Sequence, residues 1–294
     1  MQLNPVTPAT EDQNSSPRLK IYFLPNLLTA GNLFCGFLAL TKIVEADPDA
    51  ANFSSVIRHA LFYILLACIF DLLDGRVARM GGYESPFGRE FDSLADIISF
   101  GAAPAFLVHR IVLGEVFEKI PQVGWFIASV YLICGAFRLA RFNCIASTGG
   151  TSGGKEFLGF PIPMAAALVA SLTLFLLWLD EPGRHQLAEG PVWRYAQYVL
   201  PAIMLLLSFM MVSEVKYPSF KYLDWRAKRT FPKMVGIVLF IGFFIIFWDK
   251  VLQIILPFLF LVYLVYGFVR PRLSRKLRKD IEEADAEEAE EDQP

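Results

Sequence analysis

Long apolar stretches recur along most of this sequence, and they constrain its fold more than any other feature. A helix of about 20 apolar residues spans a bilayer, and helices satisfy their own backbone polar groups there. The 294 residues are 55% hydrophobic, with a mean hydropathy of +0.45, which is too apolar for an ordinary soluble domain. We therefore predict an all-α, polytopic integral membrane protein with about eight transmembrane helices, near residues 22–44, 57–75, 94–113, 123–143, 162–179, 196–214, 234–249 and 251–269.

The basic residues orient these predicted spans. If the N-terminus faces the cytosol, most of the 27 Lys and Arg residues fall on that same side, including clusters at 216–233 and 270–279. Cytoplasmic segments of membrane proteins carry such an excess. We expect both termini in the cytosol, in a bacterial plasma membrane, with a disordered tail at 1–20 and a basic then acidic tail at 271–294.

Charge enters the apolar pattern between Asp71 and Asp96. Asp71 and Asp74 are three residues apart, and Asp92 and Asp96 are four apart, so on helices each pair shares one face. Acidic residues within or beside membrane helices are costly and are functional candidates by default. Converging carboxylates suit a hard divalent cation such as Mg²⁺ or Mn²⁺. The alternative is a set of solvated loop acids beside loop arginines.

Small residues accompany these carboxylates. Gly75 would let phosphates approach the backbone, and the small side chain of Ala78 leaves space on the same helix face. Arg79 can form a fork to phosphate, and Gly88 allows close approach of helices. The pattern favours a phosphate site over solvated loops.

The complete pattern is Asp-x₂-Asp-Gly-x₂-Ala-Arg-x₈-Gly-x₃-Asp-x₃-Asp, running from Asp71 to Asp96. It resembles, at every fixed position, the signature of the CDP-alcohol phosphotransferase family of integral membrane enzymes. The resemblance implies a homodimer whose first six spans form a catalytic bundle around a cavity open to the cytosol. It also implies a catalytic domain at 21–215, followed by a basic loop and additional spans at 216–270.

The resemblance further implies roles for the residues. Two divalent ions, Mg²⁺ or Mn²⁺, would be held by Asp71, Asp74, Asp92 and Asp96, and Asp96 would also act as the catalytic base. Gly75, Ala78, Arg79 and Gly88 would line the nucleotide and phosphate site.

The first predicted span carries a polar stripe of Asn26, Thr29 and Asn32, spaced every three residues. Such side chains often hydrogen-bond neighbouring membrane helices, and that explanation suffices for the stripe alone. However, Pro25 to Thr29 also resembles the family, in which this stripe faces the cytidine nucleotide. The resemblance therefore implies nucleotide contact for Asn26 and Thr29, but not for Asn32.

The fourth predicted span ends in a basic segment that contains Arg138, Arg141 and Asn143. Basic residues at a helix end can be a plain positive-inside flank. The segment Phe-Arg-Leu-Ala-Arg-Phe-Asn and the later Gly-Phe-Pro-Ile-Pro at 159–163 also resemble the subgroup of this family whose acceptor is serine. Serine carries a carboxylate and an ammonium group, which an additional arginine and asparagine can recognise. The resemblance thus implies serine binding by Arg138, Arg141 and Asn143.

The implied reaction joins CDP-diacylglycerol and L-serine and releases CMP. The expected partners are these two substrates and the surrounding membrane lipids, with no nucleic acid. Two alternatives stay open. Another family member would use a phosphorylated alcohol, as in phosphatidylglycerophosphate or phosphatidylinositol phosphate synthesis. A divalent-cation channel or transporter would use the acidic cluster as a filter, although a cation pathway gains nothing from the adjacent Arg79.

Overall fold

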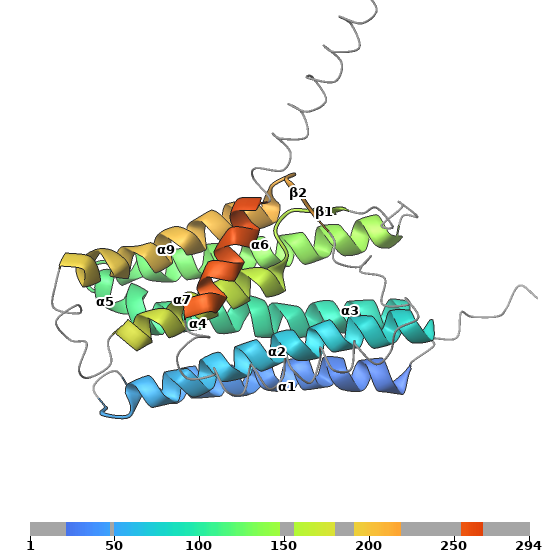
Figure 1. The fold of residues 1–294 in the computed structure, drawn as a ribbon, viewed down its shortest axis with the longest axis horizontal. Coiled ribbons are helices and arrows are strands. Elements are labelled where there is room, and N and C mark those ends of the chain that lie inside the picture. The colour runs from blue at the N-terminus through green and yellow to red at the C-terminus, as the bar shows by residue number, and fades with distance from the viewer. Residues whose placement is uncertain (1–21, 48–49, 148–155, 180–190, 219–253, 267–294) are drawn as a thin grey trace, which may run out of the picture.

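The protein, seen here as a computed structural model, is described for residues 22–47, 50–147, 156–179, 191–218 and 254–266 (Figure 1). Predictions for the two tails, for the 148–155 loop and for the span near 234–249 lie outside these residues. The described elements are α1 (Phe23–Glu45), α2 (Phe53–Gly81), α3 (Pro86–Asp96), the π-helix η1 (Ile97–Ala102), α4 (Ala103–Val108), the π-helix η2 (His109–Leu113), α5 (Gly114–Val116), α6 (Pro121–Ser147), β1 (Glu156–Leu158), α7 (Ile162–Leu179), α9 (Pro191–Val212), β2 (Lys216–Pro218) and a C-terminal helix (Ile254–Tyr266).

The all-helical architecture agrees with the predicted fold class. Within the described ranges, four helices are long and apolar enough to cross a membrane: α1, α2, the run Pro86–Leu113 and α6. They coincide with the first four predicted spans. Shorter apolar helices occupy the predicted spans near 162–179, 196–214 and 251–269. The count of eight spans and the six-span bundle remain predictions.

Two helices extend further than their apolar patterns suggest. Helix α2 continues to Gly81, beyond the expected end near residue 75, and the next helix starts at Pro86 rather than near 94. Polar residues occupy both extensions, so hydropathy alone does not mark them. As a result, the whole acidic motif lies on helices.

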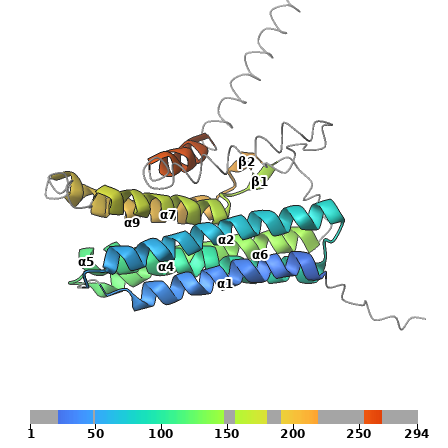
Figure 2. The ribbon, with the colours of Figure 1, turned by 60° about the horizontal axis from the view of Figure 1, so that its bottom comes forward.

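The long helices run alongside one another, with α1 and α2 side by side (Figure 1, Figure 2). Figure 2 shows the C-terminal helix on the side of α7 and α9 that faces away from α1 and α2. Its Tyr263 ring packs against Phe160, with ring centroids 5.7 Å apart.

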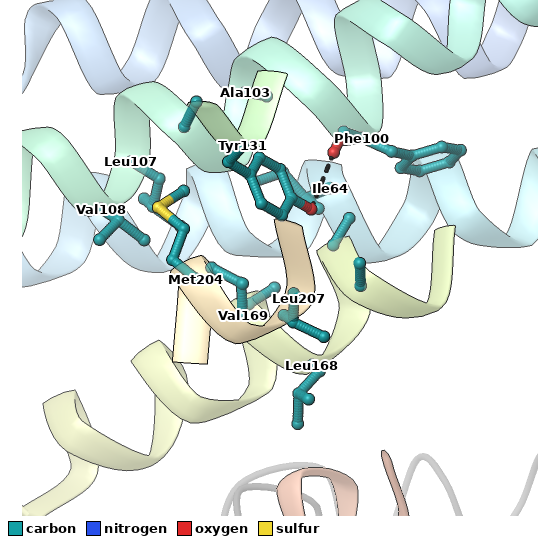
Figure 3. Close-up of a cluster of buried hydrophobic side chains, with 14 of the residues drawn as sticks. Ile64, Phe100, Ala103, Leu107, Val108, Tyr131, Leu168, Val169, Met204 and Leu207 are labelled. Atoms are coloured by element: carbon teal, nitrogen blue, oxygen red, sulfur yellow. Dashed lines mark hydrogen bonds between the residues drawn. The ribbon is translucent and has the colours of Figure 1, made fainter. Parts of the chain in front are cut away.

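The apolar core forms where α2, α4, α6, α7 and α9 meet (Figure 3). Ile64, Leu107, Leu168 and Leu207 are fully buried there. Tyr131 is also fully buried, and its hydroxyl donates a hydrogen bond of 3.1 Å to the carbonyl of Phe100 in η1. Since a buried phenol needs a partner, this bond ties α6 to the π-helix.

A short antiparallel pair of strands is the one described departure from helices. It joins Glu156–Leu158 to Lys216–Pro218. Gly159, the residue after β1, has φ +76°, and a Cβ atom there would lie 2.4 Å from the Met211 carbonyl oxygen. Glycine is therefore required where the backbone of residue 159 approaches that of Met211. Three-residue strands carry too little periodicity to be predicted from sequence.

Candidate active site

A tight reversal between α2 and α3 places the acidic motif. Gly82 ends α2 in a left-handed conformation with φ 64°, and the amide of Tyr83 donates to the Ala78 carbonyl at 2.8 Å. Ser85 then caps α3, accepting a 3.0 Å hydrogen bond from the Gly88 amide, with Pro86 at the first helical position. The reversal lets carboxylates of α2 and α3 approach one another.

Three of the four predicted metal ligands converge. Asp71, Asp74 and Asp92 each offer a carboxylate oxygen, and these oxygens lie within 4.8 Å of one another. Asp74 is buried and accepts a 2.8 Å hydrogen bond from the Thr29 hydroxyl. The Oδ1 atom of Asp92 is buried and has no hydrogen-bond partner among the described residues. Close carboxylates that leave an oxygen unsatisfied fit a hard divalent cation, so this cluster can hold a metal ion.

The cluster borders a cavity of about 580 Å³. Asp74 and Asp92 line it, beside every residue predicted to contact the nucleotide or phosphates: Asn26, Thr29, Gly75, Ala78, Arg79 and Gly88. Further lining comes from Pro25, Tyr83, Glu84, Ser85, Pro86, Arg89, Phe142 and Ala146. The structure thus gathers the predicted donor-site residues of α1, α2 and α3 around one space.

Glycine matters at the narrow part of this space. A Cβ atom on Gly88 would lie 3.4 Å from the Asn26 side-chain oxygen and 3.2 Å from the Ser85 hydroxyl. On Gly75 it would lie 3.3 Å from the Arg79 guanidinium. A larger side chain at either position would press on groups that line the cavity.

Asp96 is placed differently from the other three carboxylates. It is buried, lies outside both the three-carboxylate group and the cavity lining, and accepts a 3.2 Å hydrogen bond from Asn32. Its predicted roles as a fourth ligand and as the base remain predictions.

The predicted serine-binding residues lie on α6, which lines the cavity through Phe142 and Ala146, but none of the three is itself a lining residue. Arg141 donates to the carbonyl oxygens of Val212 at 2.9 Å and of Met211 and Ser213 at 3.4 Å, so it caps the C-terminal end of α9. The Asn143 amide donates to the Ser93 hydroxyl at 3.0 Å and to Glu90 at 3.1 Å. These two side chains already have protein partners, and their role toward serine stays a prediction.

Arg138 differs from both. It is half-buried, and its Nε atom is buried without a hydrogen-bond partner among the described residues. It lies within electrostatic range of Asp71 and Asp96. Of the three predicted serine contacts, it alone combines an unsatisfied donor with proximity to the carboxylates.

Two residues near the site were not singled out from the sequence. Arg89 lines the cavity, with a buried Nε atom that has no hydrogen-bond partner in the described part of the chain. Asn32 contacts Asp96, although the stripe pattern indicated only helix packing for it. An arginine next to a motif glycine and an asparagine in a membrane helix have common structural explanations, so neither carried a distinguishing signal.

Comparison with known proteins agrees with this geometry. The CDP-alcohol phosphatidyltransferase family profile matches residues 22–210, and the chain belongs to this family of membrane enzymes. The chain is 34% identical to the CDP-diacylglycerol–serine O-phosphatidyltransferase of Helicobacter pylori (strain ATCC 700392 / 26695) over 250 residues, covering 85% of this chain and 91% of the relative. It is 31% identical to the enzyme of the same name from Bacillus subtilis (strain 168) over 68% of this chain and 92% of the relative. An archaetidylserine synthase from Methanothermobacter thermautotrophicus is 32% identical over 66% of this chain and 69% of the relative.

Proposed function

We propose that this enzyme transfers the phosphatidyl group of CDP-diacylglycerol to the hydroxyl of L-serine and releases CMP. The observation that carries the proposal is the cavity that joins two carboxylates of the acidic cluster to all six predicted donor-site residues. The names of the relatives supply the acceptor, because all three contain serine while their lipid parts differ.

The chain's own residues account for the donor side. Asp71, Asp74 and Asp92 would hold two divalent ions, Mg²⁺ or Mn²⁺, which when bound neutralise charge on the pyrophosphate and on departing CMP. Arg79 binds phosphate oxygens, because a guanidinium matches their geometry. Asn26, Thr29, Gly75, Ala78 and Gly88 shape the space for the nucleotide.

The transfer itself forms one bond and breaks one. The serine oxygen attacks the phosphoryl group that carries the diacylglycerol, and the bond from that phosphorus to the CMP oxygen breaks. Asp96 accepts the hydroxyl proton as the new bond forms. Arg138, Arg141 and Asn143 orient the serine carboxylate and ammonium group. The acyl chains remain in the surrounding membrane lipid.

The test is CMP release by purified protein from CDP-diacylglycerol in Mn²⁺ or Mg²⁺. We expect release that depends on L-serine and is not supported by glycerol 3-phosphate or an inositol phosphate. Release with a phosphorylated alcohol instead would assign the chain to another activity of its family. Metal flux into liposomes without any CMP release would favour the cation-channel alternative.

The proposal includes a homodimer in a bacterial plasma membrane, with both termini and the site facing the cytosol. The Gly/Ser/Thr-rich loop at 148–155 and the basic segment at 216–233, which mostly lie outside the described residues, should then be cytosolic. Single cysteines at Ser152 and Ser219, in a cysteine-free background, should react with an impermeant maleimide only when the cytosolic face is opened. Labelling in intact cells would reverse the topology.

A further inference from the structure

The hydrogen bond between Asn32 and Asp96 joins two buried polar side chains from separate membrane helices. Asn32 is 0% exposed in α1, and Asp96 is 5% exposed at the end of α3. The Nδ2 atom of Asn32 donates to Oδ1 of Asp96 at 3.2 Å. The reverse orientation of the amide would set two acceptor oxygens against each other, so the amide has one favourable orientation.

Backbone contacts hold this amide in place. The Ser99 hydroxyl in η1 donates a 3.0 Å hydrogen bond to the backbone carbonyl of Asn32 itself. One turn further along α1, a Cβ atom on Gly36 would lie 2.7 Å from the Ser99 Cα atom. Helix α1 therefore packs directly on the π-helical backbone that follows Asp96, which is the close approach that small residues permit in membrane bundles.

The π-helix is fixed from its other side as well. The Tyr131 hydroxyl of α6 donates to the Phe100 carbonyl, the residue next to Ser99. Single π-helical turns are frequent at functional sites, because they re-aim the residues around them. Asp96, which directly precedes η1, is thus oriented by contacts from α1 and α6 together.

We propose that Asn32 is a positioning residue for Asp96. The Asn32 amide occupies Oδ1 and thereby fixes the orientation of the Asp96 carboxylate. The inference rests on the proposed function, in which Asp96 is the base. It assigns to Asn32 a role that the helix-packing explanation of the polar stripe does not contain.

The experiment compares Asn32→Ala and Asn32→Leu with Thr173→Val in purified protein. Leucine branches at Cγ as asparagine does, is larger and has no donor, so it removes the hydrogen bond without leaving a cavity. Thr173 is an equally buried polar residue on α7 whose hydroxyl bonds its own helix at the Val169 carbonyl. We expect both Asn32 variants to lower kcat about ten- to a hundredfold, because misplacing a reacting group costs this order of magnitude. The KM for CDP-diacylglycerol should stay within twofold, and Thr173→Val should leave kcat unchanged.

A double-mutant cycle separates positioning from a general structural effect. If Asn32 acts through Asp96, adding Asn32→Ala to Asp96→Asn should cause no further loss of kcat. Multiplicative losses would show independent action and overturn the proposal. So would unchanged kcat in the single variants, or a failure of both Asn32 variants to fold where Thr173→Val folds normally.

Measurements on the wild-type protein distinguish a failure of this inference from a failure of the proposed function. Absence of serine-dependent CMP release in the wild type would overturn both. Normal wild-type release together with normal kcat in Asn32→Ala would overturn the positioning role alone.

Discussion

The proposed donor and acceptor sides of this site are built differently. On the donor side, residues of α1, α2 and α3, together with Phe142 and Ala146 of α6, line a cavity. On the acceptor side, Arg141 binds the end of α9 and Asn143 binds α3. The donor-side residues border a cavity, whereas the donor groups of Arg141 and Asn143 already bond the protein. The Oδ1 atom of Asn143 is buried without a hydrogen-bond partner among the described residues, so it could accept from a serine ammonium group without an exchange, whereas a new bond from the donor atoms already in use would cost the hydrogen bonds given up.

The largest expected effect tests the donor side. Asp71→Asn, Asp74→Asn and Asp92→Asn should each remove a charged ligand from the three-carboxylate cluster. We expect loss of detectable CMP release together with loss of Mn²⁺-dependent binding of CDP-diacylglycerol, measured by calorimetry on the same preparations. Glu84→Gln, which removes a carboxylate from the cavity lining but not from the cluster, is the matched control. Retained metal-dependent binding in the Asn variants would contradict the assignment of the cluster.

Asp96→Asn should slow the transfer reaction without weakening the binding of CDP-diacylglycerol or metal. Asp96 is not one of the three carboxylates whose oxygens lie within 4.8 Å of one another, so this variant should bind CDP-diacylglycerol and Mn²⁺ nearly as well as the wild type. Turnover should fall about a hundred- to ten-thousandfold, the usual contribution of a positioned general base. If the variant loses binding as severely as Asp71→Asn, Asp96 is chiefly a metal ligand. Near-normal turnover would contradict the mechanism.

The acceptor side should respond in the serine KM. Losing a charge-assisted bond to the serine carboxylate costs roughly 1.5–3 kcal/mol, so Arg138→Ala, Arg141→Ala and Asn143→Ala should each raise this KM about ten- to a hundredfold. The KM for CDP-diacylglycerol should stay nearly constant.

Arg141→Ala has a second expected effect that separates two roles. It should also lower the Tm, since three carbonyl groups at the end of α9 lose their donor. A lower Tm with an unchanged serine KM would make Arg141 purely a helix cap, and the same KM result for Asn143→Ala would leave it a link between α6 and α3.

The contrast between the two sides also explains how far sequence reasoning reached. The first four spans were predictable because a membrane helix must be apolar over its length. The part of the donor side between Asp71 and Asp92 was predictable because its residues lie close together in sequence, on two helices joined by a short reversal. Asn26 and Thr29 of α1 were predicted only through the family resemblance. The partners of Arg141 on α9, 70 to 72 residues away, depend on how distant helices pack, which no local pattern encodes. The π-helix after Asp96 and the bond from Asn32 are tertiary features of the same kind.

The smallest expected effect concerns Arg89. Its variant tests whether Arg89 belongs to the donor side. Its guanidinium lines the cavity next to Gly88, and its buried Nε atom lacks a hydrogen-bond partner among the described residues. A phosphate oxygen of CDP-diacylglycerol would satisfy that donor. Because Arg89 is only half-buried, solvent weakens the interaction, and Arg89→Ala should raise the KM for CDP-diacylglycerol about two- to tenfold. Arg76→Ala is the matched control, since it removes the same charge from α2 at a residue outside the cavity lining. Steady-state CMP release at saturating serine measures both variants. An equal change in both would reduce Arg89 to general surface charge, whereas a rise in the serine KM would move Arg89 to the acceptor side.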